Sequence, residues 1–189
     1  MKKRFGSKEK FREYCKRRLK RAVTKNRIKR DRITSRKIAN LIKSLKAKNI
    51  LFYIPLKSEV DVLKLLQSVR RETQKNIFVP FMEGVSFKMV KFRLPLYKRR
   101  FGIREPKNSL LKVRRIDLAI VPVLGVDGAF RRVGFGKGMY DRFFESLPYR
   151  PYIAFVELDE CFTKEIISEV HDIQADIYIT PYKTIKRKR

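Results

Sequence analysis

The amino-acid sequence predicts an α/β fold with three layers, in which helices flank a mostly parallel central sheet and a basic helix stands at the N-terminus. Continuous apolar runs at residues 50–54, 77–80 and 118–124 are typical of strands buried in a parallel sheet, the last in a strand expected at 117–123. Helical periodicity separates the first two runs, as in a right-handed βαβ unit. A chain of 189 residues with 43% hydrophobic residues is long enough to bury one core.

The N-terminal part is expected to hold two helices. The first begins after Ser7, which can act as its N-cap, and carries a narrow apolar stripe opposite a face of Lys and Arg that we expect to be solvated. The second runs from Thr34 or Ser35 to about Lys46. The stripe of the first helix consists of Phe11, Tyr14, Cys15, Leu19, Ala22 and Val23.

The remaining elements follow from the same patterns. Ser58 is expected to cap a helix that ends near Val69, residues 85–94 suggest strands, and residues 101–106 a loop closed by proline. A helix at 140–147 and strands at 152–156 and 177–179 complete a Rossmann-like fold. We expect one domain over residues 1–183 and a disordered basic tail at 184–189.

The net charge of +29 by itself indicates a nucleic-acid-binding protein. Its distribution weakens that interpretation. Residues 1–50 hold 21 Lys and Arg against 3 Asp and Glu, whereas residues 107–180 hold 10 against 11. The excess therefore belongs to the N-terminal part and the tail, so nucleic acid is not the expected partner, although a basic arm that touches RNA stays open.

Cysteine usage and hydropathy suggest a cytoplasmic protein. Cys15 and Cys161 lie far apart without close cysteine neighbours, so the sequence indicates neither a zinc site nor a disulfide framework, and both are expected to be reduced. No apolar run approaches the roughly 20 residues that span a bilayer, and the basic N-terminus lacks the apolar segment of a signal peptide. We expect no contact with a membrane.

A glycine-rich segment at residues 131–142 is the first candidate for a site. Gly134, Gly136 and Gly138 alternate, with Lys137 between two of them and arginines on both sides. Glycines permit positive φ and let backbone N–H groups approach an anion, and a helix that starts near Gly138 would direct its N-terminus to the same place. The spacing fits neither a Walker loop nor the dinucleotide fingerprint, so a flexible turn is the alternative.

Six motifs, in order along nearly the whole chain, resemble the 5-formyltetrahydrofolate cyclo-ligase family, also called 5,10-methenyltetrahydrofolate synthetases. They are Lys8-Glu-Lys-Phe-Arg12, Tyr53-Ile-Pro-Leu-Lys-Ser-Glu59, Phe101-Gly-Ile-Arg-Glu-Pro106, Asp117-Leu-Ala-Ile-Val-Pro122, Arg132-Val-Gly-Phe-Gly-Lys-Gly-Met-Tyr-Asp-Arg142, and the stretch from His171-Asp172 through Asp176 to Thr180.

The resemblance implies an ATP- and Mg²⁺-dependent enzyme that acts on 5-formyltetrahydrofolate. We expect the protein to be a monomer. Members of the family transfer the γ-phosphoryl group of ATP to the formyl oxygen. N10 then attacks the activated carbon, and loss of phosphate leaves 5,10-methenyltetrahydrofolate and ADP. A basic nucleic-acid-binding protein on an α/β scaffold is the alternative function, and an ATP-dependent ligase of a related substrate is a third.

The resemblance also assigns residues. ATP is expected at Lys8, Arg12, Arg132, Val133, Gly134, Phe135, Gly136, Lys137, Gly138, Met139 and Tyr140. Folate is expected at Ile54, Glu59, Phe135, Gly136, Lys137, Gly138, Met139 and Tyr140, and Mg²⁺ at Asp141 and Asp176.

Several of these assignments have alternatives. Glu59 suits the N–H and amino donors of a pterin ring, but it could merely favour a helix N-terminus. Asp176 could instead cap a strand. Met139 stands where the family usually has a second tyrosine, and Val133 where it has a leucine. His171, the only histidine of the sequence, is expected to close a turn rather than to act as a base.

Overall fold

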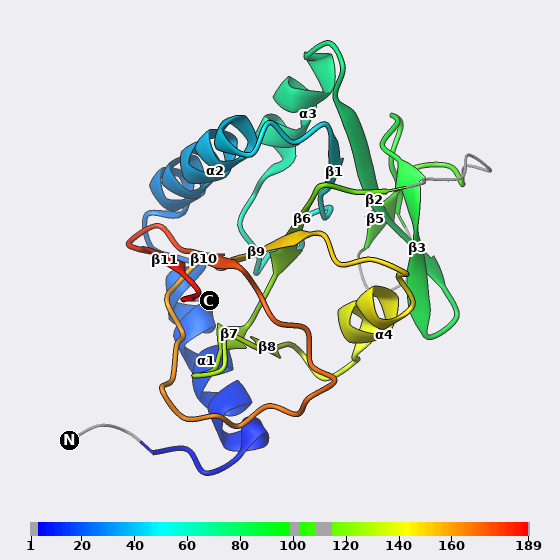
Figure 1. Cartoon of the computed structure of the whole chain (residues 1–189). Coiled ribbons are helices and arrows are strands. Elements are labelled where there is room, and N and C mark those ends of the chain that lie inside the picture. Colours follow the sequence, from blue (N-terminus) through cyan, green and yellow to red (C-terminus); the bar gives the residue numbers. More distant parts are fainter. Residues whose placement is uncertain (1–3, 99–102, 109–114, 189) are drawn as a thin grey trace.

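A computed structural model describes residues 4–98, 103–108 and 115–188 of the protein and shows a seven-stranded sheet between two layers (Figure 1). The strand order is β11-β10-β9-β6-β1-β2-β3. The predicted α/β fold with a mostly parallel sheet is confirmed. The strands span Asn49–Leu51 (β1), Asn76–Glu83 (β2), Ser86–Lys91 (β3), Leu118–Pro122 (β6), Tyr152–Val156 (β9), Ile177–Ile179 (β10) and Thr184–Lys186 (β11).

The five inner strands are parallel, and antiparallel strands close both edges. At one edge β3 folds back on β2, and at the other β11 pairs with β10. The tail expected to be disordered therefore starts as a strand, which corrects the prediction. The alternation in Thr184–Lys186 allows this, because Ile185 turns toward the core while its neighbours stay exposed.

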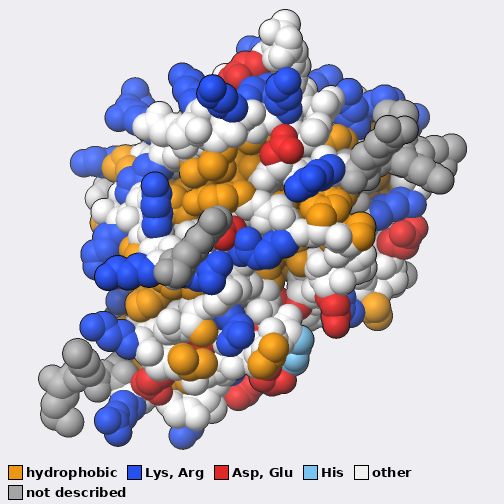
Figure 2. Space-filling view, viewed as in Figure 1, with side chains coloured by type: hydrophobic (Ala, Val, Ile, Leu, Met, Phe, Trp, Pro, Cys, Tyr) orange, Lys and Arg blue, Asp and Glu red, His pale blue; other side chains and the backbone are white. Residues whose placement is uncertain are grey.

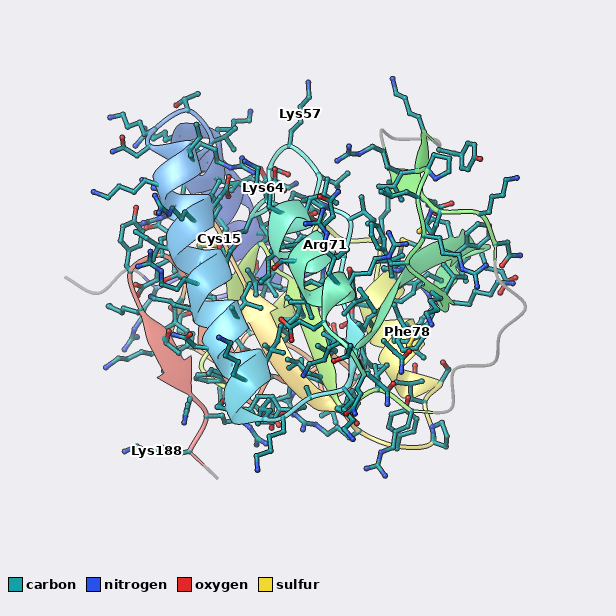
Figure 3. The ribbon with its side chains drawn as sticks, turned by 90° about the horizontal axis from the view of Figure 1, so that it is seen from above. Cys15, Lys57, Lys64, Arg71, Phe78 and Lys188 are labelled. Carbon is teal, nitrogen blue, oxygen red and sulfur yellow. A yellow bond between two sulfur atoms is a disulfide. The ribbon has the colours of Figure 1, made fainter. Side chains whose placement is uncertain are left out.

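Helices cover both faces of the sheet. Three of them, α1 (Lys8–Ala22), α2 (Arg27–Ser44) and α3 (Leu63–Arg71), pack on one face, and α4 (Met139–Glu145) packs on the other (Figure 1; α2 and α3 are seen from above in Figure 3). Strand β6 shows how one sequence serves both cores. Leu118 and Ile120 belong to the α1–α3 side, whereas Ala119 and Val121 belong to the α4 side.

The helix boundaries differ from the predictions where the apolar stripe gives no signal. Ser7 caps α1 as expected, with its hydroxyl accepting the N–H of Lys10 at 3.3 Å. Helix α2 starts at Arg27, seven residues early, because its first turns carry an exposed Ile28 and basic residues instead of a stripe. Ser58 does not cap α3; the carboxylate of Asp61 accepts the N–H of Leu63 at 3.0 Å instead.

Two small antiparallel pairs lie beside the main sheet. Strand β7 (Gly125–Val126) pairs with β8 (Arg132–Val133), and this hairpin leads into the glycine loop. Strand β4 (Tyr97–Lys98) pairs with β5 (Arg104–Glu105), and β5 lies inside the segment 101–106 that was predicted to be a loop. The buried Glu105 accepts the N–H of Met82 at 2.9 Å and thereby fixes β5 against β2. Phe101 and Gly102 of this motif lie outside the described residues.

Cys15 and Cys161 form a disulfide, which corrects the expectation that both are reduced. Helix α1 packs on β7 at Gly125, where a Cβ atom would lie 2.8 Å from the Cys15 Sγ atom. The close approach places α1 against the segment that follows β9, with the two Cα atoms 5.8 Å apart. A separation of 146 residues hid this contact from the sequence pattern.

The excess positive charge lies largely at the surface. Exposed Lys and Arg side chains follow the outer faces of α1 and α2, and Figure 2 shows Lys and Arg over much of the face in view. Within the described ranges, no helix is both long and apolar enough to cross a membrane. The exposed basic residues of the two helices include Arg17, Lys20, Arg21, Lys29, Arg32, Arg36 and Lys43.

Replacing Cys161 with serine is expected to lower the free energy of unfolding by about 2–5 kcal/mol, because the disulfide closes a long loop in the unfolded chain. Urea unfolding of the variant and the wild type measures this difference. Excess reductant is the control, since it should bring the two proteins to nearly the same midpoint. Equal stability without reductant would contradict a disulfide at this position.

Candidate active site

The glycine loop joins β8 to α4 at the carboxyl-terminal side of the central strands. Gly136 and Gly138 have φ values of 110° and 59°, which side chains with a Cβ atom rarely adopt. Gly138 is the N-cap residue of α4. Phe135, Gly136 and Lys137 are exposed, so the tip of the loop is open to solvent. A backbone of this kind can receive an anion.

The buried side chain of Arg132 lies against the loop and connects its surroundings. Its Nε atom donates to the carbonyl of Pro122 at 3.2 Å, and its guanidinium lies 4.9 Å from the centre of the Tyr140 ring. Its Nη1 atom is 3.9 Å from a carboxylate oxygen of Asp141. A Cβ atom on Gly134 would lie 2.2 Å from the same Nη1 atom, so a larger residue at this position would displace the end of the Arg132 side chain.

Helix α1 brings two further cations to the loop. The Nε atom of Arg12 donates to the carbonyl of Gly134 at 3.0 Å. One turn earlier, Lys8 donates to both carboxylate oxygens of Asp172, at 2.6 and 2.5 Å. The structure thus places Arg12 and Arg132 at one loop, although 120 residues of sequence separate the helix from it, and it pairs Lys8 with Asp172 of the second pocket.

A largely apolar pocket of about 510 Å³ opens on one side of the loop. Glu59 is its buried acid, and one carboxylate oxygen accepts the N–H of Leu56 at 2.9 Å. Burial raises the pKa of Glu59 from 4.5 to about 7, against the opposing effects of this hydrogen bond and of the charges of Arg132 and Arg27. The lining also includes Tyr53, Ile54, Leu56, Pro80, Met82, Phe87, Phe135, Met139 and Tyr140.

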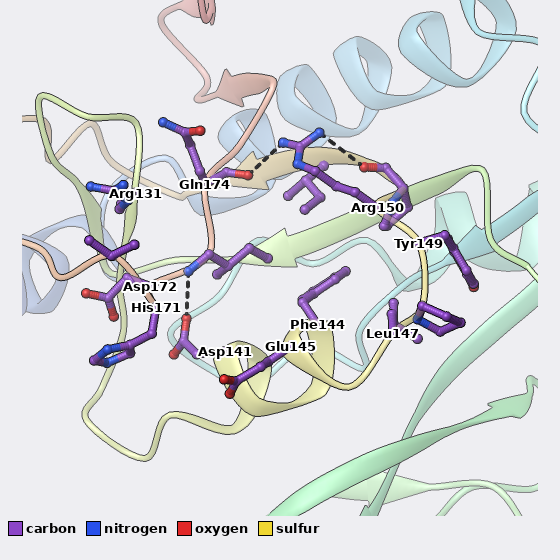
Figure 4. Close-up of a pocket in the computed structure, with 15 residues that line it drawn as sticks. Arg131, Asp141, Phe144, Glu145, Leu147, Tyr149, Arg150, His171, Asp172 and Gln174 are labelled. Atoms are coloured by element: carbon purple, nitrogen blue, oxygen red, sulfur yellow. Dashed lines mark hydrogen bonds between the residues drawn. The ribbon is translucent and has the colours of Figure 1, made fainter.

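A second pocket of about 510 Å³ lies on the other side of α4 and is shown in Figure 4. Asp141 and Asp172 both line it, and Asp141 accepts the N–H of Ile173 at 3.1 Å. Its other walls are mainly apolar or aromatic, with two arginines, a glutamate, a histidine and a glutamine. These walls comprise Arg131, Phe144, Glu145, Leu147, Pro148, Tyr149, Arg150, Pro151, Ile153, Val170, His171, Ile173 and Gln174.

Asp176, which the sequence pairs with Asp141, lies elsewhere. Its carboxylate accepts from Nη1 of Arg150 at 2.9 and 3.0 Å and from the N–H of Ile153 at 2.9 Å, and it lies 3.7 Å from Arg187. These contacts are those of a structural acid between β9 and β10. Asp172, only four residues earlier, shares the pocket with Asp141. Among the described residues no group of three or more His, Cys, Asp or Glu could hold a metal ion.

The remaining predicted residues take different positions. Val133 is fully buried, while Met139 lines the Glu59 pocket. The His171 side chain is 59% exposed and lies 3.5 Å from Glu169, in a turn before β10. This position agrees with the expectation that His171 closes a turn.

Sequence reasoning missed several residues of the Glu59 pocket. Ile103 and Arg104 come from the motif before Pro106, which was noticed without a role. Val85 lies at the tip of the β2–β3 hairpin, where its carbonyl accepts from the Arg142 Nε atom at 3.0 Å. No motif marks this hairpin, so only the fold could place it at the site.

The loop, whose backbone can receive an anion, lies between two pockets, one with an acid amid apolar walls and one with two aspartates. Such a site defines an enzyme that couples phosphate chemistry to a ring-bearing organic substrate. The chain belongs to the 5-formyltetrahydrofolate cyclo-ligase family, whose model matches residues 4–181. Members of this family are ATP-dependent ligases of folate one-carbon metabolism. The resemblance found in the motifs is thereby confirmed.

Individual relatives agree with this family. The chain is 29% identical to the 5-formyltetrahydrofolate cyclo-ligase of Haemophilus influenzae over 122 residues, 60% of the chain and 65% of that relative. It is 23% identical to the mouse (Mus musculus) enzyme of the same name over 187 residues, 90% of the chain and 92% of the relative. A relative from Arabidopsis thaliana is named as mitochondrial, so the family does not fix a compartment, and a cytoplasmic location stays a prediction.

Solved structures show the same fold. The NMR structure of the 5,10-methenyltetrahydrofolate synthetase of Aquifex aeolicus has a TM-score of 0.75 and 25% identity, covering 95% of this chain and 92% of that one. A structure of the 5,10-methenyltetrahydrofolate synthetase of Mycoplasma pneumoniae has a TM-score of 0.68 at 20% identity, covering 92% and 98%, which supports the fold alone.

The raised pKa of Glu59 predicts how stability depends on pH. The folded protein holds this proton up to about pH 7, whereas the unfolded chain releases it near 4.5. The contribution of the neutral Glu59 is therefore fully present below pH 4.5 and is lost as the pH rises through 7. The melting temperature of the wild type, relative to that of Glu59→Gln, should therefore fall as the pH rises over this range and then level off. A difference that is independent of pH between 4 and 8 would refute the shift.

Proposed function

We propose that the chain converts 5-formyltetrahydrofolate to 5,10-methenyltetrahydrofolate at the expense of ATP. The formyl oxygen attacks the γ-phosphorus, and ADP leaves. N10 then attacks the activated carbon, and the C–O bond breaks to release phosphate. The observation that carries the proposal is the position of Arg132, which contacts Tyr140 of the Glu59 pocket and also approaches Asp141 of the second pocket.

The Glu59 pocket supports binding of the folate. A carboxylate can accept two hydrogen bonds from the N–H and amino groups of a pterin, which fixes the orientation of the ring. The apolar walls suit the flat ring system, with Phe87 and Tyr140 in edge contact, their centroids 5.0 Å apart. Ile54 lines the same pocket, as expected from the resemblance. The ionised form of Glu59 is the one that accepts both bonds, so substrate binding should improve as the pH rises toward 7.

The loop and the second pocket support binding of ATP. The phosphates would lie along residues 134–138, where Arg132, Lys137, Arg12 and Lys8 supply positive charge. The second pocket begins at Asp141 and continues to apolar side chains at Phe144 and Ile153. We assign this pocket to the adenine base, because it is the apolar cavity next to the phosphate loop that the folate would leave free.

The residues present fit a magnesium ion at Asp141 and Asp172 rather than at Asp176. Mg²⁺ prefers hard oxygen ligands, and it is usually held by one or two carboxylates together with phosphates and water. Two aspartates that line one pocket match this pattern, whereas Asp176 does not line it. Both candidates already accept hydrogen bonds, Asp172 from Lys8 and Asp176 from Arg150 and Ile153, so the assignment rests on the shared pocket. When bound, the ion would neutralise charge on the phosphates of ATP.

The side chains of the chain itself have a positioning role. Phosphoryl transfer needs alignment and charge neutralisation more than covalent help, and the cations around the loop provide the neutralisation. No enzyme base is needed for attack by the formyl oxygen, which agrees with the exposed position of His171. All of these residues come from one chain, so a monomer suffices.

An absorbance assay tests the proposed function. Absorbance in the methenyl-folate band is expected to rise only when ATP, Mg²⁺ and 5-formyltetrahydrofolate are all present. Omission of each component in turn is the control. A folded sample without turnover would refute the proposal. Steeply salt-dependent binding of RNA or duplex DNA, with no effect of folate on the melting temperature, would favour a nucleic-acid-binding protein instead.

Replacing Asp172 and Asp176 separately tests the magnesium assignment. Asp172→Asn should raise the Mg²⁺ concentration needed for half-maximal turnover about tenfold or more, because it removes a charged oxygen from the pocket. Asp176→Asn should keep that concentration but lower stability by about 1–3 kcal/mol, because it weakens the hydrogen bonds of Arg150 and Ile153. Magnesium titration and urea unfolding measure the two effects, and the reverse pattern would restore Asp176 as the ligand.

A further inference from the structure

Two side chains of α2 hold the backbone of the loop that carries Glu59. The Arg27 Nη1 atom donates to the carbonyl of Lys57 at 2.7 Å, and its Nη2 atom donates to the carbonyl of Glu59 itself. The Nε atom of Arg27 donates to Asp31 at 2.8 Å. The other carboxylate oxygen of Asp31 accepts the N–H of Asp61 at 3.0 Å. The pair therefore holds residues 57–61 by hydrogen bonds on both sides of Glu59.

This segment has little other regular support on its outer side. Residues 52–62 connect β1 to α3 without helix or strand, and the Lys57 side chain points away from the protein (Figure 3). Tyr53 anchors the inner side, where its hydroxyl donates to the carbonyl of Val60 at 2.8 Å. The position of the Glu59 carboxylate in its pocket thus depends on bonds to the backbone that Arg27 and Asp31 supply.

We propose that Arg27 and Asp31 are positioning residues that hold Glu59 in the geometry needed to bind the pterin ring. The inference rests on the proposed function, since it concerns the same pocket. A planar guanidinium can direct donors at two carbonyls and one carboxylate together, which a single ammonium group cannot do in this geometry. Lysine should therefore be a poor replacement.

Stabilisation of α2 is the competing explanation. Arg27 and Asp31 are spaced as an i,i+4 pair, which contributes little to a helix. Three of the four hydrogen bonds, however, run to the loop at Lys57, Glu59 and Asp61. A pair that served only the helix would not need these bonds, and its loss would leave the loop unchanged.

The charge of Arg27 also acts on Glu59. Arg132 and Arg27 both oppose the rise in the pKa of Glu59 that burial causes. The other titratable or charged groups facing this pocket are Tyr53 from the end of β1, Tyr140 and Arg142 from α4, Arg104 from β5 and Lys137 from the glycine loop. None of these changes when Arg27 is replaced, so removing Arg27 should move the titration of Glu59 to higher pH.

Steady-state kinetics of Arg27→Gln test the proposal. We expect kcat/KM for 5-formyltetrahydrofolate to fall about tenfold, with the KM for ATP unchanged and the acid limb of the pH profile shifted upward. Arg27→Lys should restore the acid limb but not the full kcat/KM. Lys29→Gln, an exposed change on the same helix, is the matched control. Equal effects of Arg27→Gln on both substrates, or no difference from Lys29→Gln, would overturn the proposal.

A double-mutant cycle and amide exchange separate this proposal from the proposed function. In a Glu59→Gln background, Arg27→Gln should cause little further loss of kcat/KM, whereas additive losses would refute an effect through Glu59. Hydrogen exchange at the amides of residues 57–61 needs no turnover, and it should speed up in Arg27→Gln but not in Lys29→Gln. Unchanged exchange would overturn the inference even if the enzyme is active. Faster exchange in Arg27→Gln would support the contact between Arg27 and the loop even if the protein shows no turnover.

Discussion

The buried guanidinium of Arg132 is the contact on which the site depends. It lies against Gly134, covers one side of the Tyr140 ring in the wall of the Glu59 pocket, and approaches Asp141, which lines the second pocket. A buried positive charge is costly unless it is paired, and the carbonyl of Pro122 and the nearby carboxylate offset that cost. The same charge favours ionised Glu59 across the pocket. In the proposed function, the organic substrate and the phosphates would thereby lie beside one cation.

The rest of the fold supports this centre from outside. Helix α1 carries Arg12 to the loop and Lys8 to Asp172, and Gly125 permits the close packing that the Cys15–Cys161 disulfide then fixes. Helix α2 acts on the other pocket, since its first turn holds the loop of Glu59. The helices on one face of the sheet therefore have a double role, because they bury the core and also position residues of the site at the ends of the strands.

Much of the architecture followed from sequence patterns. Buried parallel strands give continuous apolar runs, so β6, β9 and β10 were placed closely, and the glycine loop was found from its alternating residues. The predicted boundaries of helices and strands were wrong where the local sequence gives no signal. The first turns of α2 carry basic residues and an exposed Ile28, and β11 is too short and polar to differ from a tail. The hairpin that brings Val85 to the site has no motif.

The sequence by itself determined the class of fold, the family and the residue types that could bind phosphate and a pterin. Only the tertiary structure decided which partners meet. It separated Asp172 from Asp176, whose carboxylate serves Arg150, and it joined two cysteines 146 residues apart. It also brought Arg27 into contact with the backbone of the Glu59 loop. Periodicity and motifs describe neighbours along the chain, whereas these contacts arise from packing between distant segments, which no local pattern encodes.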